Sequence, residues 1–451
     1  MSLFRASSLL ALPLALIAPA AGQPFEAAQV AEIAALLPDA PTGPGAPATD
    51  RAAWDALAAR PEFAALIDQA ASLADQPIPE TTDELYLEFF ETGNRTNWQR
   101  VAGQRRGRIS TLALAECLEG RGRFIGPLQG TIRAICAEPT WVMPAHDRDK
   151  RNFEGTLIDI DLGSSGLAWQ LATAYDLLGD GLEPDVRQLI HGKIRDRILD
   201  PFLAMVRGER EANWWMTATN NWNHVCLAGV VGSALAVSES PQERAEILLA
   251  GAHYSEYGLQ GFTEDGYCSE GVGYWNYGFG HFISLAEMTH QATGGRIDLF
   301  QRDDVIPPAM YGARMEIAEG VYPAFADCSV NARPDSRLMS FLGQKYQLGL
   351  DDYPPETMVG PGGGLASAVL YSFATSAATD PVEEAGRVRL GLTEWFEEAG
   401  ILISRAGDSK LAIAGKGGHN SEHHNHNDVG SYVVVVGGRA VLLDPGAETY
   451  T

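Results

Sequence analysis

Apolar residues recur with a helical period along most of the chain. Between about residues 26 and 385, successive segments such as "SGLAWQLATAYDLLGD" and "HVCLAGVVGSALAV" place apolar side chains at i, i+3, i+4 and i+7. Glycine, proline or aspartate separates these segments, as expected at helix ends and turns. We find no repeat of fixed length. Successive helix hairpins therefore predict stacked helix pairs, as in an α-solenoid or toroid.

A strand pattern replaces the helical one near residue 390. The segments "ILISRAGDSKLAIAG" and "SYVVVVGGRAVLLDPG" are short, rich in β-branched residues and interrupted by glycine, which is typical of strands. Gly437 and Gly438 lie between two apolar runs and predict a hairpin turn. We therefore expect a helical domain at residues 23–388 and a β domain at residues 389–451.

The predicted β domain is small, with only three or four strands before Thr451. An isolated sheet of this size is marginally stable, so either the sheet packs on the helical domain or the natural chain continues. We favour the second explanation, because the sequence stops inside what looks like a motif, "DPGAETYT".

The N-terminus has the form of a secretory signal peptide. Residues 1–22 contain one early basic residue, Arg5, then a short apolar run and small residues, so that cleavage could follow Ala20, Ala21 or Gly22. A membrane anchor is the weaker alternative, because the run is short and contains two prolines. The expected location is the periplasm or the extracellular medium, with no membrane contact after cleavage.

The chain of 451 residues carries a formal net charge of −25. It lacks the basic field that nucleic-acid binding requires, and it repels polyanions at long range, so an anionic ligand needs local positive charge. Residues 92–108 contain five arginines, whose guanidinium groups can bind carboxylate or sulfate. A solvated helix face with salt bridges explains most of them better. Arg95 is the exception that we take as a substrate-binding candidate.

Four of the ten histidines lie within "HNSEHHNHND", residues 419–428. In an extended segment, His424 and His426 point to one side and His423 to the other. An H-x-H pair is a common way to put two imidazoles into one metal or catalytic site. A solvated polar loop is the alternative, but four histidines before a strong strand favour function.

Tryptophan and asparagine gather at residues 213–229, "NWWMTATNNWNHVCLAG", at the start of an apolar helix. Exposed indole surfaces suit sugar rings and Asn amides orient hydroxyls or carboxylates. These properties make Asn221, Trp222, Asn223 and His224 candidate site residues. The alternative is an aromatic core contact at a capped helix, in which Asn221 and the asparagine before it are simply caps.

Residues 264–282, "EDGYCSEGVGYWNYGFGHF", combine tyrosine, histidine and glycine. Tyr274, Tyr277 and His281 stand at i, i+3 and i+7 and would share one helix face, while the glycines let a ligand approach the backbone. Tyrosine can act as acid or base when nearby positive charge lowers its pKa. A packed aromatic helix start is an equally simple explanation for either tyrosine. Glu270 joins the substrate-binding candidates.

The motifs "NNWNH", "EGVGYWNYG" and "HNHNDVGSYVVVVGGRAVLLDPG" occur in an order that resembles the heparinase II/III-like polysaccharide lyase superfamily, and the resemblance covers nearly all of the predicted mature chain. It implies a mainly α fold, an incomplete (α/α) toroid, followed by an antiparallel β-sandwich, with the active cleft between them. It also implies β-elimination at a uronic acid. That reaction needs the carboxylate neutralised, a base beside C5 and an acid at the leaving O4.

The resemblance also implies roles for individual residues. Asn223 would help to neutralise the carboxylate, and His224 would be a neutraliser or the base on one side. Tyr274 or Tyr277 would be the general acid, and possibly the base for the other C5 epimer; Tyr274 ranks first because it better matches the "EGxxY" context. His424 would assist from the β domain. Fixed donors around the developing enolate would supply much of the rate.

Some members of the superfamily hold a structural zinc beneath the β-domain histidine, and that pattern would make His426 and Asp444 ligands. A tetrahedral site needs further partners. Another histidine is expected downstream, but the sequence has none after His426. The ligand set for Zn²⁺ is therefore incomplete in this chain.

The leading hypothesis is an exported polysaccharide lyase that cleaves a uronate-containing polysaccharide or oligosaccharide and leaves a 4,5-unsaturated uronate. One alternative is a toroid glycoside hydrolase with paired carboxylates, for which Glu264, Asp265 and Glu270 are available. Another is a non-catalytic carbohydrate-binding protein of the same architecture. The expected partner is an acidic sugar polymer or oligosaccharide and not nucleic acid, with the oligomeric state left open. The acidic net charge favours a uronan with few or no sulfates.

Overall fold

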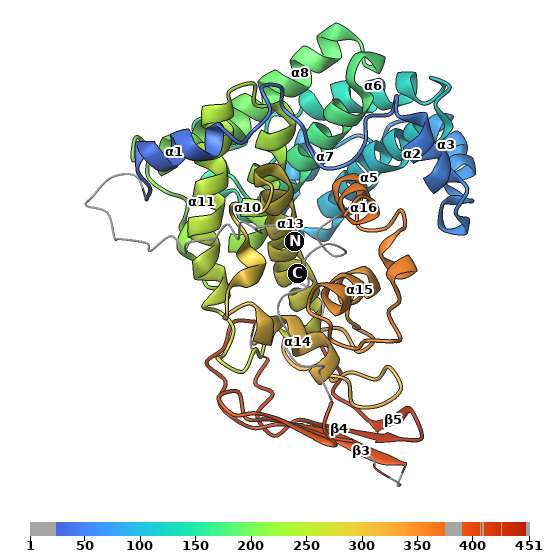
Figure 1. The fold of residues 1–451 in the computed structure, drawn as a ribbon, viewed down its shortest axis with the longest axis vertical. Coiled ribbons are helices and arrows are strands. Elements are labelled where there is room, and N and C mark those ends of the chain that lie inside the picture. The colour runs from blue at the N-terminus through green and yellow to red at the C-terminus, as the bar shows by residue number, and fades with distance from the viewer. Residues whose placement is uncertain (1–23, 375–389, 406, 408–409, 425, 448–451) are drawn as a thin grey trace, which may run out of the picture.

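The computed structural model describes residues 24–374, 390–405, 407, 410–424 and 426–447. Helices fill the chain as far as residue 372, and an antiparallel sheet follows at one end of the helical body (Figure 1). The α-helices are α1 (Ala27–Ala34), α2 (Arg51–Ala58), α3 (Leu66–Ala74), α4 (Asp83–Thr92), α5 (Thr96–Glu119), α6 (Ile125–Cys136), α7 (Leu162–Leu178), α8 (Pro184–Ile194), α9 (Asp200–Val206), α10 (Asn221–Val237), α11 (Pro241–Leu259), α12 (Gly271–Tyr274), α13 (Gly280–Thr293), α14 (Ile306–Arg314), α15 (Ser336–Lys345) and α16 (Leu365–Ser372).

Helix α10 lies in the middle of the helical body and packs along α7, with α11 and α13 also against it (Figure 1). Its side chains are apolar and buried almost all round, as expected of a helix surrounded by others. Two glycines let α7 come close. A Cβ on Gly229 would stand 2.6 Å from the Ser165 backbone, and one on Gly232 would stand 2.2 Å from Nε1 of Trp169.

The sheet has the order β1-β2-β3-β4-β5, and every neighbouring pair is antiparallel. Gly437 and Gly438 form the predicted turn of the last hairpin, both in the left-handed region that glycine adopts without strain. The strands are β1 (Thr393–Phe396), β2 (Ile401–Ser404), β3 (Leu411–Lys416), β4 (Tyr432–Val436) and β5 (Arg439–Leu442).

One face of the sheet packs on the helical domain. The ring of Phe396 lies 5.4 Å from that of Tyr267 and 6.2 Å from that of Tyr311, measured between ring centroids. The guanidinium of Arg314 covers the same phenylalanine and also pairs with Glu394 at 2.9 Å. The small sheet is therefore stabilised by burial against helices. Packing on the helical domain was one of the two explanations that we considered for so small a sheet.

The predicted fold class is confirmed, because a mainly helical toroid precedes an antiparallel sheet. The described part of the β domain is one layer of five strands, where the sequence predicted three or four. The predicted signal peptide and the domain boundary at residue 388 lie outside the described residues. Among the helices that the structure describes, none combines the length and apolarity needed to cross a membrane.

The close contact between α7 and α10 can be tested with Gly232→Ala. The added Cβ would collide with the Trp169 indole, so we expect a loss of roughly 1–3 kcal/mol in the free energy of unfolding. Urea unfolding at equilibrium measures it. Gly192→Ala in α8 is the matched control, because nothing lies within 4 Å of the added Cβ there and alanine favours a helix over glycine. Equal stability of the two variants would contradict close packing at Gly232.

Candidate functional site

A π-helical turn divides the tyrosine segment. Helix α12 ends at Tyr274, residues Trp275–Phe279 form a π turn, and α13 begins at Gly280. Such turns are rare in proteins, but those that occur are often found at functional sites. The sequence predicted that the two tyrosines share one face, and the structure corrects this: Tyr274 faces the loop that follows β3, whereas Tyr277 lines a separate cavity beside His281.

The buried carboxylate of Glu270 joins three distant segments. Its Oε2 accepts the backbone N–H of Asn221 at 2.9 Å, and its Oε1 accepts the side-chain amide of the same residue at 2.7 Å. The Oε1 atom also lies 3.2 Å from Nε2 of His424. The start of α10, the start of α12 and the β3–β4 loop therefore meet at one carboxylate.

His424 is held between two carboxylates and an aromatic ring. Its Nδ1 lies 3.1 Å from Asp327, and its ring stacks on Tyr274 at 4.1 Å between centroids and 25° between planes. Burial alone would lower the pKa of His424, but the hydrogen bond and charge of Glu270, together with Asp327, outweigh it and raise the pKa. We call Asn221, Glu270, Tyr274, Asp327 and His424 the Glu270 group.

The backbone of His424 is in the left-handed region, with φ of 52°. That conformation is uncommon outside glycine, so the histidine segment is not extended, which was the condition for the alternation expected from the sequence. The expected grouping nevertheless holds, because His426 also approaches Asp327, at 3.6 Å, while His423 turns to Thr219 at 3.1 Å. The contacts of Asp327, and not strand alternation, bring the two histidines to one side.

A buried ion pair helps to hold the histidine loop. Nζ of Lys416, at the end of β3, lies 2.6 Å from Oε2 of Glu422, and both side chains are nearly inaccessible. The carboxylate of Asp428 accepts the backbone N–H of Ala326, beside Asp327. The loop is thus tied to the sheet at one point and to the helical domain at another, which fixes the position of His424.

A small hollow beside the Glu270 group exposes an amide that sequence reasoning treated only as a helix cap. Thr219, Asn220, Asn221, Glu270 and Tyr274 are among the residues that line it. Asn220 does cap α10, because its side-chain oxygen accepts the backbone N–H of Trp222. The side chain, which also carries the amide nitrogen, is half-buried. Its position beside the candidate asparagines was the only local signal in the sequence that pointed to Asn220 as a site residue.

Asn223 and His224 lie in the interior of the helical domain. The amide of Asn223 donates to the carbonyls of Trp215, Met216 and Tyr254 at 3.2, 2.9 and 3.0 Å. Nε2–H of His224 donates to the Ser255 carbonyl at 3.0 Å, and burial lowers the pKa of this histidine to about 4. These contacts commit both side chains to backbone carbonyls, although His224 also lines the hollow beside the Glu270 group, together with Asn220.

The arginine-rich segment serves the structure at most of its positions. Arg105 pairs with the buried Glu138 at 3.0 Å, and Arg106 and Arg108 donate to backbone carbonyls of other segments. Arg95 immediately precedes α5, and its guanidinium approaches the side-chain amide of Gln99 one turn along the helix. Arg105, Arg106 and Arg108 therefore have a structural role, which was the alternative to ligand binding. They act inside the helical domain and not on a solvated helix face, as that alternative had expected.

Trp222 belongs to an aromatic surface next to the start of α10. Its ring lies 4.9 Å from that of Trp214, which is 55% exposed, and 4.5 Å from that of His146. The imidazole of His146 is fixed by Asp161, whose Oδ2 lies 2.7 Å from its Nδ1. Partly exposed indole rings of this kind suit the faces of sugars.

The expected zinc ligands do not form a recognisable metal site with the residues around them. Within the part of the chain that the structure describes, no group of three or more His, Cys, Asp or Glu side chains is arranged to hold a metal ion. His426 approaches Asp327, and Asp444 accepts the N–H of Gly446 at 2.8 Å. The donors present do not fit tetrahedral zinc, and zinc stays a prediction from the resemblance.

Comparisons with known proteins show similarity at the level of the fold and not of the sequence. No family model and no curated protein sequence matches the chain. Among solved structures, heparinase III is similar with a TM-score of 0.52 at 13% identity, over 80% of this chain and 52% of that chain. Similarity extends to a heparan sulfate lyase HepC mutant from Pedobacter heparinus (TM-score 0.46, 13% identity, 86% of this chain and 61% of that one). It extends also to chondroitin AC lyase from Streptomyces coelicolor A3 in complex with chondroitin sulphate (TM-score 0.47, 12% identity, 84% of this chain and 58% of that one).

The chain thus spans about half the length of heparinase III. At this identity the likeness concerns the arrangement of helices and sheet and not the identity of the substrate. We conclude that the chain has the fold of a polysaccharide lyase.

Proposed function

We propose that the protein is an exported polysaccharide lyase that cleaves a uronate-containing polysaccharide or oligosaccharide by β-elimination. The observation that carries the proposal is the contact between Tyr274 and His424 on the Glu270 carboxylate. Chain segments about 150 residues apart meet there, as the resemblance requires. The lyase fold of heparinase III is consistent with the same reaction class.

Tyr274 is the proposed proton-transfer residue. In the proposed reaction its phenolate oxygen takes the C5 proton, the C5–H electron pair forms the C4–C5 double bond as the C4–O4 bond breaks, and the phenol so formed returns the proton to the leaving O4. The imidazole of His424, whose pKa is raised by Glu270 and Asp327, lies against the phenol ring. In that position it stabilises negative charge that develops on the tyrosine or on the enolate.

Amide donors at the start of α10 are the proposed neutralisers of the substrate carboxylate. Asn220 lines the hollow beside Tyr274, where its side-chain amide can donate to a carboxylate. The first backbone N–H groups of α10 are already bonded to Glu270 and Asn220. Asn221 is already bound to Glu270, so its part is to place that carboxylate under His424. Hydrogen bonds that strengthen as the enolate forms would lower the barrier.

The carboxylates nearest to this site are poorly suited to glycoside hydrolysis. Glu270 and Asp327 lie on opposite sides of His424, but their side chains are only 9% and 5% exposed and both are bound to it. Asp265 accepts from Thr263 and from the backbone of Glu397. A hydrolase needs one carboxylic acid and one carboxylate that reach the sugar, so elimination is the better account.

The first prediction for this function concerns the product. Mixing the full chain with alginate, heparan sulfate, chondroitin and a plant uronan should give, with at least one polymer, the ultraviolet absorbance of a double bond conjugated to a carboxylate. Tyr274→Phe should lower kcat by roughly 10²–10⁴-fold, because the proton-transfer group is lost. Tyr257→Phe removes a hydroxyl from α11 and is the matched control.

Three outcomes would count against this assignment. Absence of absorbance with every polymer would contradict lyase activity, and reducing sugar released without a double bond would indicate a hydrolase. Full activity of Tyr274→Phe with loss of activity in Tyr277→Phe would move the chemistry to the other tyrosine.

The second prediction concerns Asp327, which sequence reasoning missed. Asp327→Asn removes one of the charges that raise the pKa of His424, so the imidazolium should be lost at lower pH than in the wild type. We expect the alkaline limb of the kcat/KM profile to move to lower pH. Proton NMR titration of the His424 ring, assigned with His424→Gln, should show a lower pKa in the variant. An unchanged pKa would contradict the role of Asp327.

A stability measurement supplies a control that needs no activity. Because folding raises the pKa of His424, protonation of this residue stabilises the folded state fully below the unfolded pKa of about 6.5, and this contribution is lost as the pH rises through the folded pKa. His424→Gln should therefore lower the free energy of unfolding more in acidic than in alkaline buffer. The opposite trend would mean that the imidazole is held neutral.

A further inference from the structure

Lys416 is a buried lysine between two chain segments of the Glu270 group. It is the last residue of β3, and its side chain is only 1% exposed. Lysine is almost never buried to this extent unless its charge is paired. An ammonium at this place must therefore be held by an opposite charge and by contacts that replace water.

The ammonium of Lys416 contacts both segments. Its Nζ lies 2.6 Å from Oε2 of Glu422, which precedes His424 by two residues. It also lies over the ring of Tyr267, 5.6 Å from the centroid, and Tyr267 precedes Glu270 by three residues. A cation within about 6 Å of an aromatic face is attracted to it, most strongly where water is excluded. One positive charge thus joins the loop that carries His424 to the segment that carries Glu270.

The contact with Tyr267 is made by the ring and not by the hydroxyl. The tyrosine is buried, and its hydroxyl has no hydrogen-bond partner among the described residues. Burial raises the pKa of Tyr267, so the ring faces the ammonium as a neutral phenol. The same ring packs against Tyr311 of α14 and Phe396 of β1. These neighbours fix the surface on which the ammonium rests.

The main chain of Lys416 closes the base of the histidine loop. Its N–H donates to the carbonyl of Ser431 at 2.9 Å, and its carbonyl accepts the N–H of Gly430 at 2.8 Å. Glu422 lies within the loop so closed, and its side chain is 8% exposed. A shift of the loop would separate two buried charges and leave both without water, which is costly. The ion pair therefore favours one position of the loop.

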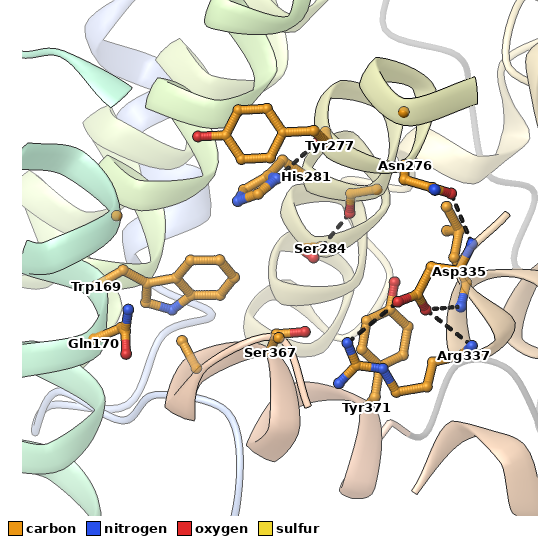
Figure 2. Close-up of a pocket in the computed structure, with 16 residues that line it drawn as sticks. Trp169, Gln170, Asn276, Tyr277, His281, Ser284, Asp335, Arg337, Ser367 and Tyr371 are labelled. Atoms are coloured by element: carbon orange, nitrogen blue, oxygen red, sulfur yellow. Dashed lines mark hydrogen bonds and ion pairs between the residues drawn. The ribbon is translucent and has the colours of Figure 1, made fainter. Parts of the chain in front are cut away.

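The cavity that Tyr277 lines lies apart from these contacts. Figure 2 shows Tyr277 beside His281, with ring centroids 5.0 Å apart, and Trp169 across a cavity of about 350 Å³. Neither Lys416 nor Tyr267 is among the described residues that line it. A change at Lys416 should therefore leave the ring of His281 where it is.

We propose that Lys416 is a positioning residue, which holds the His424 ring against Tyr274. The inference rests on the proposed lyase function for its effect on the reaction, but the position of the ring can be measured without turnover. Lys416 acts through Glu422 on the histidine loop and through Tyr267 on the segment of Glu270. Because displacement of a reacting group by about 1 Å can cost about 10²-fold in rate, this support matters to the chemistry.

The test replaces the ion pair by apolar side chains of similar size. Lys416→Met alone leaves Glu422 buried without a partner and should lower stability, whereas the double variant Lys416→Met, Glu422→Leu removes both charges, a change that is often neutral or stabilising. Urea unfolding should show that the double variant is about as stable as the wild type. With whichever of alginate, heparan sulfate, chondroitin or plant uronan the wild type cleaves, kcat of the double variant should fall by roughly 10²-fold and KM should change little.

The position of His424 has a spectroscopic signature. Its ring stacks on Tyr274 at 4.1 Å between centroids, so the ring current of the tyrosine should move the imidazole proton resonances upfield. His424→Gln assigns these resonances in protein with labelled histidine. In the double variant they should move toward the values of an unstacked histidine, while those of His281 stay in place. Arg296→Met is the matched control, because it breaks an exposed ion pair of the same 2.6 Å length; it should change neither kcat nor the His424 signal.

Tyr267 supplies an independent pair of variants. Tyr267→Phe keeps the aromatic face and removes only a hydroxyl that has no partner in the described structure, so kcat and the His424 signal should stay as in the wild type. Tyr267→Leu removes the face on which the Lys416 ammonium rests. It should lower kcat and move the His424 signal in the same direction as the double variant. Circular dichroism checks that each variant folds.

The outcomes separate this proposal from the proposed lyase function. Wild-type kcat with an unmoved His424 signal in the double variant would overturn the positioning role, and so would equal effects of Tyr267→Phe and Tyr267→Leu. If the wild type forms no unsaturated product with any polymer, the lyase assignment fails. A moved His424 signal in the double variant and in Tyr267→Leu would then still support the role of Lys416 in placing the ring.

Discussion

The site depends on one buried carboxylate that must be fully bonded. Glu270 has lost most of its water, and a buried charge is tolerated only when hydrogen bonds and an opposite charge replace hydration. Asn221 supplies two N–H donors and His424 supplies the charge. This requirement forces the start of α10 and the β3–β4 loop to meet the start of α12, although they are far apart in sequence.

The same requirement explains the state of His424. An imidazole between Glu270 and Asp327 is more stable as a cation, so its pKa rises despite partial burial. The loop that carries it cannot relax easily, because Lys416 and Glu422 form a second buried pair at its base. The Tyr274 ring therefore stacks on an imidazole whose protonated form is favoured by its two carboxylate neighbours, and the chemistry that we propose depends on that contact.

Neighbouring residues of one helix serve two different spaces. The π turn separates Tyr274, on the Glu270 group, from Tyr277, in the cavity with Trp169. A regular α-helix would have kept both tyrosines closer to one face. One inserted residue in the helical period thus turns the two tyrosines to different sides of the segment, while the core behind α10 stays closely packed.

The sequence by itself determined the local elements and named the segments that meet. Helical and strand periods and the Gly437–Gly438 turn follow from short-range geometry, whereas His424 and His426 are grouped by their long-range contacts with Asp327. Only the tertiary structure decided which polar groups are bonded in the interior and which are left accessible. Asn223 was predicted at the site but bonds interior carbonyls, while Asp327 had no local signal. Burial and long-range partners select the exposed groups, and no spacing along the chain encodes them.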